Sequence, residues 1–192
     1  NHRLGAMGFA HLEEFGGPDF ASSGSVGMQD IVASLAWIKE NIAQFGGDPD
    51  RVLVYGQSGG GAKTSTLLAM PSAKGLFQRA GVMSGSALSV QSEEDASATA
   101  AAFLRVLGLE KGDVHKLRTL PLTTLVAAQA GMEADMRARC EAPRTFGPVV
   151  DGIAIPEQTW TPDAPEISSD VPMVISTALD ERTYRMGNFD MT

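Results

Sequence analysis

The pentapeptide Gly56–Gly60 holds the residues of this chain with the clearest capacity for chemistry. It places Ser58 at the centre of the pattern Gly-x-Ser-x-Gly, with a glycine two residues to either side. A serine hydroxyl attacks a carbonyl carbon when a base takes its proton and when N–H groups stabilise the resulting oxyanion. Glycines at the two outer positions, Gly56 and Gly60, would let a strand and a helix approach closely at a very sharp turn. The expected chemistry is acyl transfer through a serine ester, which needs neither a metal ion nor an organic cofactor.

The segments on either side of the pentapeptide predict a strand before the serine and a helix after it. Arg51–Tyr55 is a short β-branched and aromatic run, which predicts a buried strand. Gly61–Met70 predicts a helix that is stopped by Pro71. Each of the three glycines in Gly59–Gly61 costs about 1 kcal/mol in a helix relative to alanine, which indicates that close backbone approach is required here. A serine between a strand and a helix in this way is the nucleophile elbow of an α/β-hydrolase.

The acid and the base of such a site are expected downstream of the serine, in that order. Asp180 and Glu181 follow a predicted strand at 171–176, so the requirement for an acid is met. No histidine follows these acids. The histidines of the chain all lie upstream, where solvated or helix-capping roles are expected: His2, His11 and His115.

The groups that stabilise an oxyanion are also incomplete in the sequence. The backbone N–H of Gly59, directly after the nucleophile, supplies one donor. The partner donors should come from a glycine-rich loop before the elbow strand, and no His-Gly-Gly-Gly segment precedes residue 51. The sequence therefore contains about half of an active site.

The remaining segments predict an α/β fold whose sheet is mostly parallel, with helices on both faces. Residues 1–27 predict a strand end and a long surface loop, and the apolar positions of Met28–Phe45 form one stripe along a helix. A helical block at about 92–140, capped by Ser92, interrupts the alternation as an insertion. We expect a single partial domain over 1–192, with the sheet core at 1–91 and 141–192. Further sheet-like segments are expected at Ala80–Ser84, Phe146–Gly152 and Val171–Ser176.

Composition and charge exclude several classes of protein. The chain is 43% hydrophobic and 20% charged, as in ordinary soluble globular proteins, and no apolar run approaches the ~20 residues of a membrane span. The net charge of −8 and the scattered basic residues argue against a nucleic-acid surface. The single cysteine, Cys140, favours a reducing, cytoplasmic compartment, although secretion stays open because the chain begins without an initiator Met.

A phosphate-binding loop is the alternative from a different class. Residues 56–64 almost match the pattern Gly-x-x-x-x-Gly-Lys-Thr, but Ala62 separates Gly61 from Lys63. The additional residue would move the lysine away from the β-phosphate, so Lys63 is expected to be a solvated helix residue. Stabilisation of the protein by ATP would support this alternative.

Several further blocks of sequence flank the elbow in a fixed order: Asn1–Gly5, Gly24–Asp30, Trp37–Ile42, Phe45–Pro49, Leu76–Ala80, Met83–Ser86 and Phe146–Gly152. Together with the elbow they resemble the type-B carboxylesterase (cholinesterase-like) family, and the bacterial para-nitrobenzyl esterases in particular. The resemblance covers nearly the whole chain and is weakest in the helical insertion. It implies the α/β-hydrolase fold and a small-molecule ester as substrate.

The resemblance also implies roles for individual residues. Ser58 matches the family's nucleophile, and Gly59 matches its oxyanion donor, where the family usually has alanine. Glu181 matches the acid of an Asp-Glu-Gly motif that here is Asp-Glu-Arg, with Asp180 as the less favoured acid. Ser84 matches a serine that supports the acid, and an ordinary strand-end hydroxyl is an equal alternative. Three matched positions are expected to be structural: Arg3, Asp30 and Asp151.

The family pattern places the oxyanion loop before Asn1 and the catalytic histidine beyond Thr192, so the resemblance implies that this chain is an internal portion of an esterase. We expect the 192 residues alone to have negligible activity, since loss of the base costs about 10⁶ in kcat in a comparable serine hydrolase. The alternative within the same fold is a non-catalytic binding or adhesion module. Such modules typically lose the nucleophile or the acid, and both are retained here.

Overall fold

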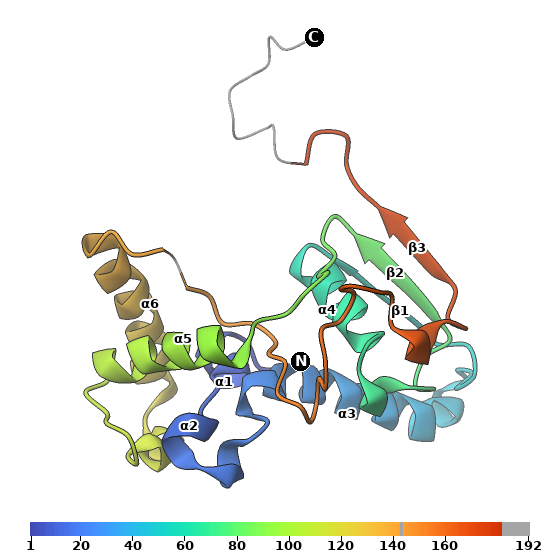
Figure 1. Ribbon diagram of the computed structural model, residues 1–192. Helices are drawn as coiled ribbons and strands as arrows, with labels where there is room; N and C mark the ends of the chain where they lie inside the picture. Colours follow the sequence, from blue (N-terminus) through green and yellow to red (C-terminus); the bar gives the residue numbers. More distant parts are fainter. Residues whose placement is uncertain (143, 182–192) are drawn as a thin grey trace, which may run out of the picture.

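The computed structural model describes residues 1–142 and 144–181, which form a small sheet with two helices beside a group of further helices (Figure 1). Within these ranges, no helix combines the length and the apolar character that crossing a bilayer requires. The α-helices and strands are α1 (Gly5–Phe9), α2 (Glu13–Gly16), α3 (Val26–Asn41), β1 (Leu53–Gln57), α4 (Gly59–Leu67), β2 (Arg79–Met83), α5 (Glu93–Val106), α6 (Leu122–Ala138) and β3 (Met173–Ser176). Short 3₁₀ helices lie between them: η1 (Pro18–Phe20), η2 (Ser23–Ser25), η3 (Ile42–Phe45), η4 (Pro71–Ala73), η5 (Val114–Thr119) and η6 (Glu166–Ser168).

The three strands form one parallel sheet in the order β1-β2-β3. The strands predicted at Arg51–Tyr55, Ala80–Ser84 and Val171–Ser176 are thus confirmed, but β1 lies two residues further along the chain than expected and leads without a break into Ser58. The register pairs Gln57 with Met83, and Met83 with Ser176, so all three strands end level with one another. The carboxyl ends of parallel strands are the usual place for a site in α/β proteins.

Only one face of this sheet is covered by helices within the described residues. Helix α4 packs there directly and α3 packs against α4, over a core that includes Met28, Leu67 and Ala80. On the opposite face, Tyr55 is 67% exposed and Val174 is 71% exposed. The expectation that the elbow strand is buried is therefore wrong for its outer face. A β-branched and aromatic run predicts a strand, but it does not reveal whether both faces are covered.

The first part of the chain is not the surface loop that the sequence predicts. It forms α1, α2, η1 and η2, and every residue from Phe9 to Leu12 is buried. Helix α1 lies close against α3 because Gly27 has no side chain: a Cβ there would overlap the ring of Phe9 in α1 and would lie 2.6 Å from the carbonyl oxygen of Arg3 just before it. These helices are too short for apolar periodicity to reveal them.

The predicted helical block is present and packs against α1. Its first helix, α5, is capped as expected, because Ser92 Oγ accepts a hydrogen bond from the N–H of Asp95 at 3.2 Å. Within the block, residues Val114–Thr119 form the 3₁₀ helix η5 between α5 and α6. The core of the block is formed by side chains from α1 and the residue after it, from α5 and from α6: Ala6, Ala10, Ala100, Phe103, Leu104, Ala128, Met132 and Met136.

The sheet-like segment Phe146–Gly152 is not a strand in the structure. Its only pairing is an isolated bridge between Gln91 and Val149. The chain then turns around Asp151. Its Oδ1 accepts hydrogen bonds from the backbone N–H groups of residues 153, 154 and 155, at 2.8–3.0 Å. A carboxylate that satisfies backbone donors in this way favours a turn over a ladder.

Candidate active site

Ser58 forms a sharp corner between β1 and α4. Its backbone has φ 55° and ψ −119°, a conformation that residues other than glycine rarely adopt. Such a conformation costs about 1–3 kcal/mol and persists only where the surrounding structure enforces it. The strand ends at the preceding residue and the helix begins at the following one, so the corner exposes the serine side chain at the end of the sheet.

The glycines around the corner differ in what they contribute. A Cβ on Gly56 would overlap the backbone of Gly60, and a Cβ on Gly61 would overlap the carbonyl oxygen of Gly85, both far inside 3.0 Å. Gly56 is thus required for close approach, as predicted. The same prediction for Gly60 is wrong, because a Cβ there would meet nothing within 4 Å. Gly56 must lack a side chain because the Gly60 backbone occupies the space beside it. The second position that must lack a side chain is Gly61, because the Gly85 carbonyl oxygen occupies the space beside that residue.

The first turn of α4 presents unused donors beside the serine. The first hydrogen bond of the helix runs from the N–H of Ala62 to the carbonyl of Ser58, at 3.0 Å. The N–H groups of Gly59–Gly61 precede this bond, so they have no acceptor within the helix. The positive end of the helix dipole lies at the same place. Because Ser58 alone separates β1 from α4, there is no room for the longer loop with which a nucleotide-binding protein surrounds phosphates.

The carboxyl ends of the three strands lie at one edge of the sheet (Figure 1), and a predicted site residue follows each of them in the chain. Ser58 follows β1 and Ser84 follows β2; Ser84 also has a positive φ, 52°. Glu181 comes after β3, where its Oε1 accepts a hydrogen bond from the N–H of Ala178 at 2.7 Å. The sheet therefore brings the two serines to neighbouring strand ends and directs the carboxylate segment to the same edge. Arg182, the third residue of the acidic motif, lies outside the described residues.

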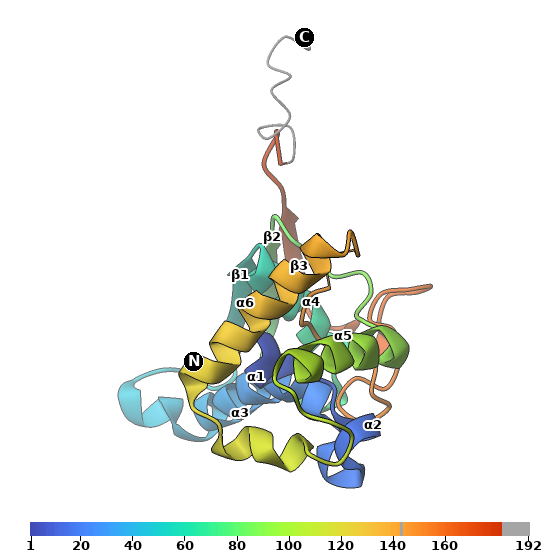
Figure 2. The same cartoon turned by 90° about the vertical axis from the view of Figure 1, so that its left-hand side faces the viewer.

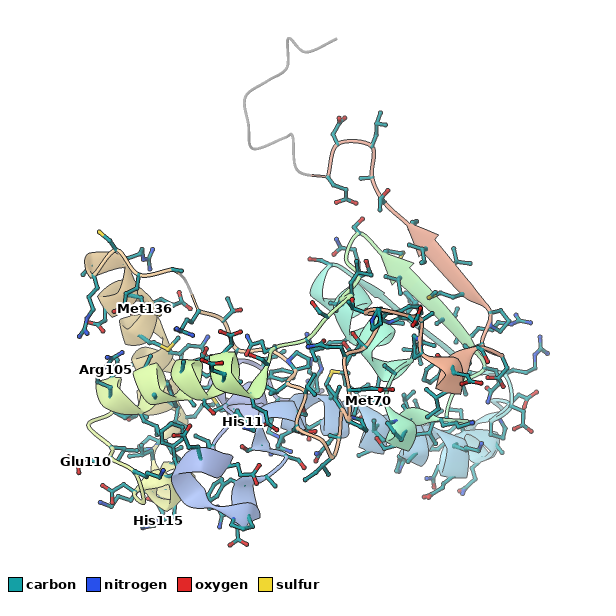
Figure 3. The ribbon with its side chains drawn as sticks, in the orientation of Figure 1. His11, Met70, Arg105, Glu110, His115 and Met136 are labelled. Carbon is teal, nitrogen blue, oxygen red and sulfur yellow. The ribbon has the colours of Figure 1, made fainter. Side chains whose placement is uncertain are left out.

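The histidines do not complete a catalytic site within the described residues, since none of them is hydrogen-bonded to Ser58. His11 was expected to be solvated or to cap a helix, but it is only 3% exposed; it belongs to the first segment of the chain and lies beside α5 (Figure 3). His115 is exposed, and its Nδ1 lies 3.0 Å from the carbonyl oxygen of Gly112 just before η5. Figures 1 and 2 show η5 at the opposite end of the molecule from the ends of the strands.

A group of charged side chains lies next to α4. Arg3 Nε and Nη2 donate to the carboxylate of Asp30 at 2.9 and 2.6 Å, and this contact lowers the pKa of Asp30 to about 2. Burial lowers the pKa of His2, and the positive charge of Lys63 lowers it further. Lys63 is not simply solvated: its Nζ donates to the carbonyl of Gly59 at 3.4 Å and lies 5.9 Å from the centre of the Phe9 ring.

The sequence gives no hint of one contact that the structure adds at the nucleophile. Gly85, in the turn after β2, lies directly against the backbone of Ser58. Two residues after Gly85, the N–H of Ala87 donates a hydrogen bond to Ser65 Oγ on α4 at 2.9 Å, which ties the same turn to this helix. The block Met83–Ser86 is part of the family resemblance, but neither its spacing nor its composition indicates which residue it contacts.

Comparison with protein families and with known proteins gives matches over most of the chain. The model of the carboxylesterase family matches residues 1–190. The chain is 41% identical over 185 residues to the para-nitrobenzyl esterase of Bacillus subtilis (strain 168), covering 94% of this chain and 36% of that protein. It is also 35% identical over 163 residues to human (Homo sapiens) neuroligin-2, covering 82% of this chain and 18% of the relative.

Solved structures give the same result for the fold. The chain superposes on the carboxylesterase EST55 of Geobacillus stearothermophilus with a TM-score of 0.83 and 34% identity. That match covers 99% of this chain and 38% of the enzyme. The chain thus spans less than two fifths of these two esterases.

Proposed function

This chain belongs to the carboxylesterase family and has the α/β-hydrolase fold, and on that premise we propose that the protein containing it hydrolyses carboxylic esters through an acyl-enzyme at Ser58. The observation that carries the proposal is the backbone of Ser58, with φ 55° and ψ −119° between the end of β1 and the first residue of α4. A strained serine at this corner has its hydroxyl displayed and backbone donors beside it, which is the arrangement that acyl transfer requires.

The proposed reaction has two steps. Ser58 Oγ bonds to the ester carbonyl carbon and gives its proton to a base, and the carbonyl oxygen becomes an oxyanion that accepts a hydrogen bond from Gly59 N–H. Collapse of this intermediate breaks the bond to the alcohol oxygen, which leaves with the proton. Water then attacks the acyl-serine, releasing the carboxylic acid and restoring the hydroxyl. The base is proposed to be a histidine in a part of the protein beyond this chain.

Glu181 is proposed as the acid that orients this base, and Ser84 as a hydroxyl that supports the acid. Two observations support the assignment: both residues follow strand ends at the edge where Ser58 lies, and Ser84 has the positive φ of a tight turn. A carboxylate in this role holds the imidazole in the tautomer that accepts the serine proton.

The proposal is tested with the full-length protein that contains this chain. We expect it to hydrolyse p-nitrophenyl butyrate and to react covalently with a fluorophosphonate probe, and we expect Ser58→Ala to abolish both. Ser89→Ala, which changes another exposed serine, is the matched control and should leave both unchanged. A full-length protein that neither turns over the ester nor takes the probe would contradict the proposal.

A non-catalytic binding module is the second candidate, and the similarity to neuroligin-2 favours it. The presence of both Ser58 and Glu181 favours the esterase instead. The probe experiment separates the two, because a binding module would remain unlabelled while still folded.

We further propose that the substrates are small-molecule esters and that the protein works in a reducing compartment, the cytoplasm. An exposed free thiol at Cys140 supports the compartment, since such a thiol is prone to oxidation elsewhere. Fractionation of producing cells tests it, and recovery of the protein from the medium would contradict it.

A further inference from the structure

We propose that the turn after β2, residues 84–87, is a positioning element that holds the backbone of the nucleophile, Ser58, in its strained conformation. Gly85 is the residue of this turn that contacts Ser58. This rests on the proposed function, because the residue that is positioned is the proposed nucleophile. A Cβ placed on Gly85 would lie 2.8 Å from both the Cα and the carbonyl carbon of Ser58, and closer still to the carbonyl oxygen. Real Cβ atoms essentially never approach this closely, so any side chain at residue 85 must displace the Ser58 backbone or the turn.

The turn is enclosed between the nucleophile and the first turn of α4. A Cβ on Gly61 would overlap the carbonyl oxygen of Gly85, and it would lie 3.1 Å from the carbonyl oxygens of Gly56 and Met83. Three backbone segments therefore touch without any intervening side chain: the corner at Ser58, the start of α4 and the turn after β2. A displacement of one segment must be transmitted to the other two, because close-packed interiors do not absorb it.

Buried hydrogen bonds hold this turn in place. Ser65, which is 3% exposed, donates from Oγ to the carbonyl of Ala62 at 2.9 Å and accepts from the N–H of Ala87 at 2.9 Å. Thr159 is 1% exposed, and its Oγ1 lies within hydrogen-bonding distance, 3.3 Å, of the carbonyl oxygen of Ala87. Trp160 Nε1 donates to the carbonyl of Ser65 at 2.9 Å, so residues far along the chain secure the same helix.

The backbone conformations on both sides of this contact explain why it is needed. Ser58 and Ser84 have positive φ values, 55° and 52°, which only an over-determined environment maintains. The N–H of Ser58 donates to Met83 and that of Ser84 donates to Ser176, both at 2.8 Å, which fixes the strand side of each corner. The Gly85 contact fixes the other side of Ser58. Without it, the serine could relax toward an ordinary conformation and its Oγ would move.

A displaced Oγ affects chemistry more than binding. A misplacement of about 1 Å can cost about 100-fold in rate, whereas an ester held by pockets elsewhere binds as before. We therefore expect Gly85→Ala to lower the acylation rate constant at least 30-fold and to change KM by less than 3-fold. Ser65→Ala removes the acceptor of the Ala87 N–H without adding any atom at the corner, and we expect an intermediate loss of about 5- to 10-fold.

The experiment uses the full-length protein, with the pre-steady-state burst of p-nitrophenol giving the acylation rate and thermal unfolding giving stability. Gly147→Ala is the matched control, because beyond its chain neighbours the added Cβ would meet only Gln91 Nε2, at an ordinary contact distance of 3.8 Å, and it should acylate within 2-fold of wild type. Folded Gly85→Ala and Ser65→Ala variants that also acylate within 2-fold of wild type would overturn the inference. If Gly85→Ala fails to fold, Ser65→Ala decides alone. Absence of both a burst and probe labelling in the wild-type protein would instead refute the proposed function, and this inference with it.

Discussion

The N–H of Ser58 donates to the carbonyl oxygen of Met83 at 2.8 Å, so the ladder between β1 and β2 continues one residue beyond β1 and ends on the serine. The nucleophile is therefore held as part of the sheet, although its dihedral angles are those of a turn. A serine in a free loop would have to be ordered each time an ester binds. Here the ordering is completed by folding, which is the basis of preorganised catalysis.

The two glycines that flank the serine are expected to respond differently to alanine. Gly56→Ala forces a methyl group into the backbone of Gly60, so we expect at least a 100-fold loss of kcat and destabilisation by about 2–4 kcal/mol. Gly60→Ala adds a methyl group to open space on a helix, so kcat should stay within 3-fold and stability should rise by up to about 1 kcal/mol. Ester turnover and chemical denaturation of the full-length variants measure both effects. Equal losses in the two variants would contradict this expectation.

The two acidic residues after β3 are expected to differ as well. Glu181→Gln removes the negative charge that orients the base, and we expect a fall in kcat of at least 100-fold with little change in KM. Asp180→Asn is the matched control, with an expected change below 5-fold. Steady-state kinetics of the two full-length variants decide between the residues, and a larger loss in Asp180→Asn would reverse the assignment.

The ion pair between Arg3 and Asp30 is expected to make stability depend on acid pH. Asp30 has a pKa of about 2 in the folded protein and 3.8 as an unperturbed carboxyl, so the unfolded state binds the proton more readily. Its contribution is fully present above pH 4 and is lost as the pH falls from about 4 to 2. We expect Asp30→Asn to lower the free energy of unfolding by about 1 kcal/mol at pH 7, a value reduced by the exposure of Arg3.

Denaturation of wild type and Asp30→Asn at pH 7 and near pH 2 measures this dependence. The difference between them should shrink at the lower pH, where about half of the wild-type carboxylates are themselves protonated. Asp19→Asn, at an exposed carboxylate, is the control. A difference that is constant between the two pH values would mean that the ion pair contributes nothing.

The cap of α5 gives a prediction about stability alone. Ser92→Ala leaves the N–H of Asp95 without its side-chain acceptor, so we expect destabilisation by about 1 kcal/mol and unchanged kcat. Urea denaturation and ester turnover check this, with Ser89→Ala as the uncapped comparison. A lower kcat of Ser92→Ala, measured under conditions where the variant is fully folded, would show that α5 also contributes to the site.

The parts of the fold that the sequence predicts are those that depend on neighbouring residues. The corner at Ser58, the cap at Ser92 and the helix that begins near Val26 each follow from residue types within one or two turns. The segment around Asp151 was predicted wrongly, because its apolar composition is strand-like while the carboxylate satisfies three backbone donors of a turn. Helices α1 and α2 escape prediction because, with five and four residues, they are much shorter than the window over which helical periodicity can be recognised.

The parts that the sequence does not predict depend on contacts between distant residues. The contact of Gly85 with Ser58 joins two strand ends, and no spacing rule relates the two positions. The Gly-x-Ser-x-Gly pattern has glycine at both outer positions, so it also does not predict that a side chain at Gly60 would have open space. The assignments of Ser58, Gly59, Ser84 and Glu181 to catalytic roles remain predictions, supported by their arrangement at one edge of the sheet.

The bare side of the sheet has a practical consequence for anyone who produces this segment. Tyr55 and Val174 lie in the same row across the three strands, joined by the small residue Gly81, and both are mostly exposed. An exposed apolar row of this kind favours association in water. These 192 residues made by themselves should therefore form oligomers whose size increases with protein concentration. Light scattering over a dilution series would register the growth, and Tyr55→Lys should diminish it.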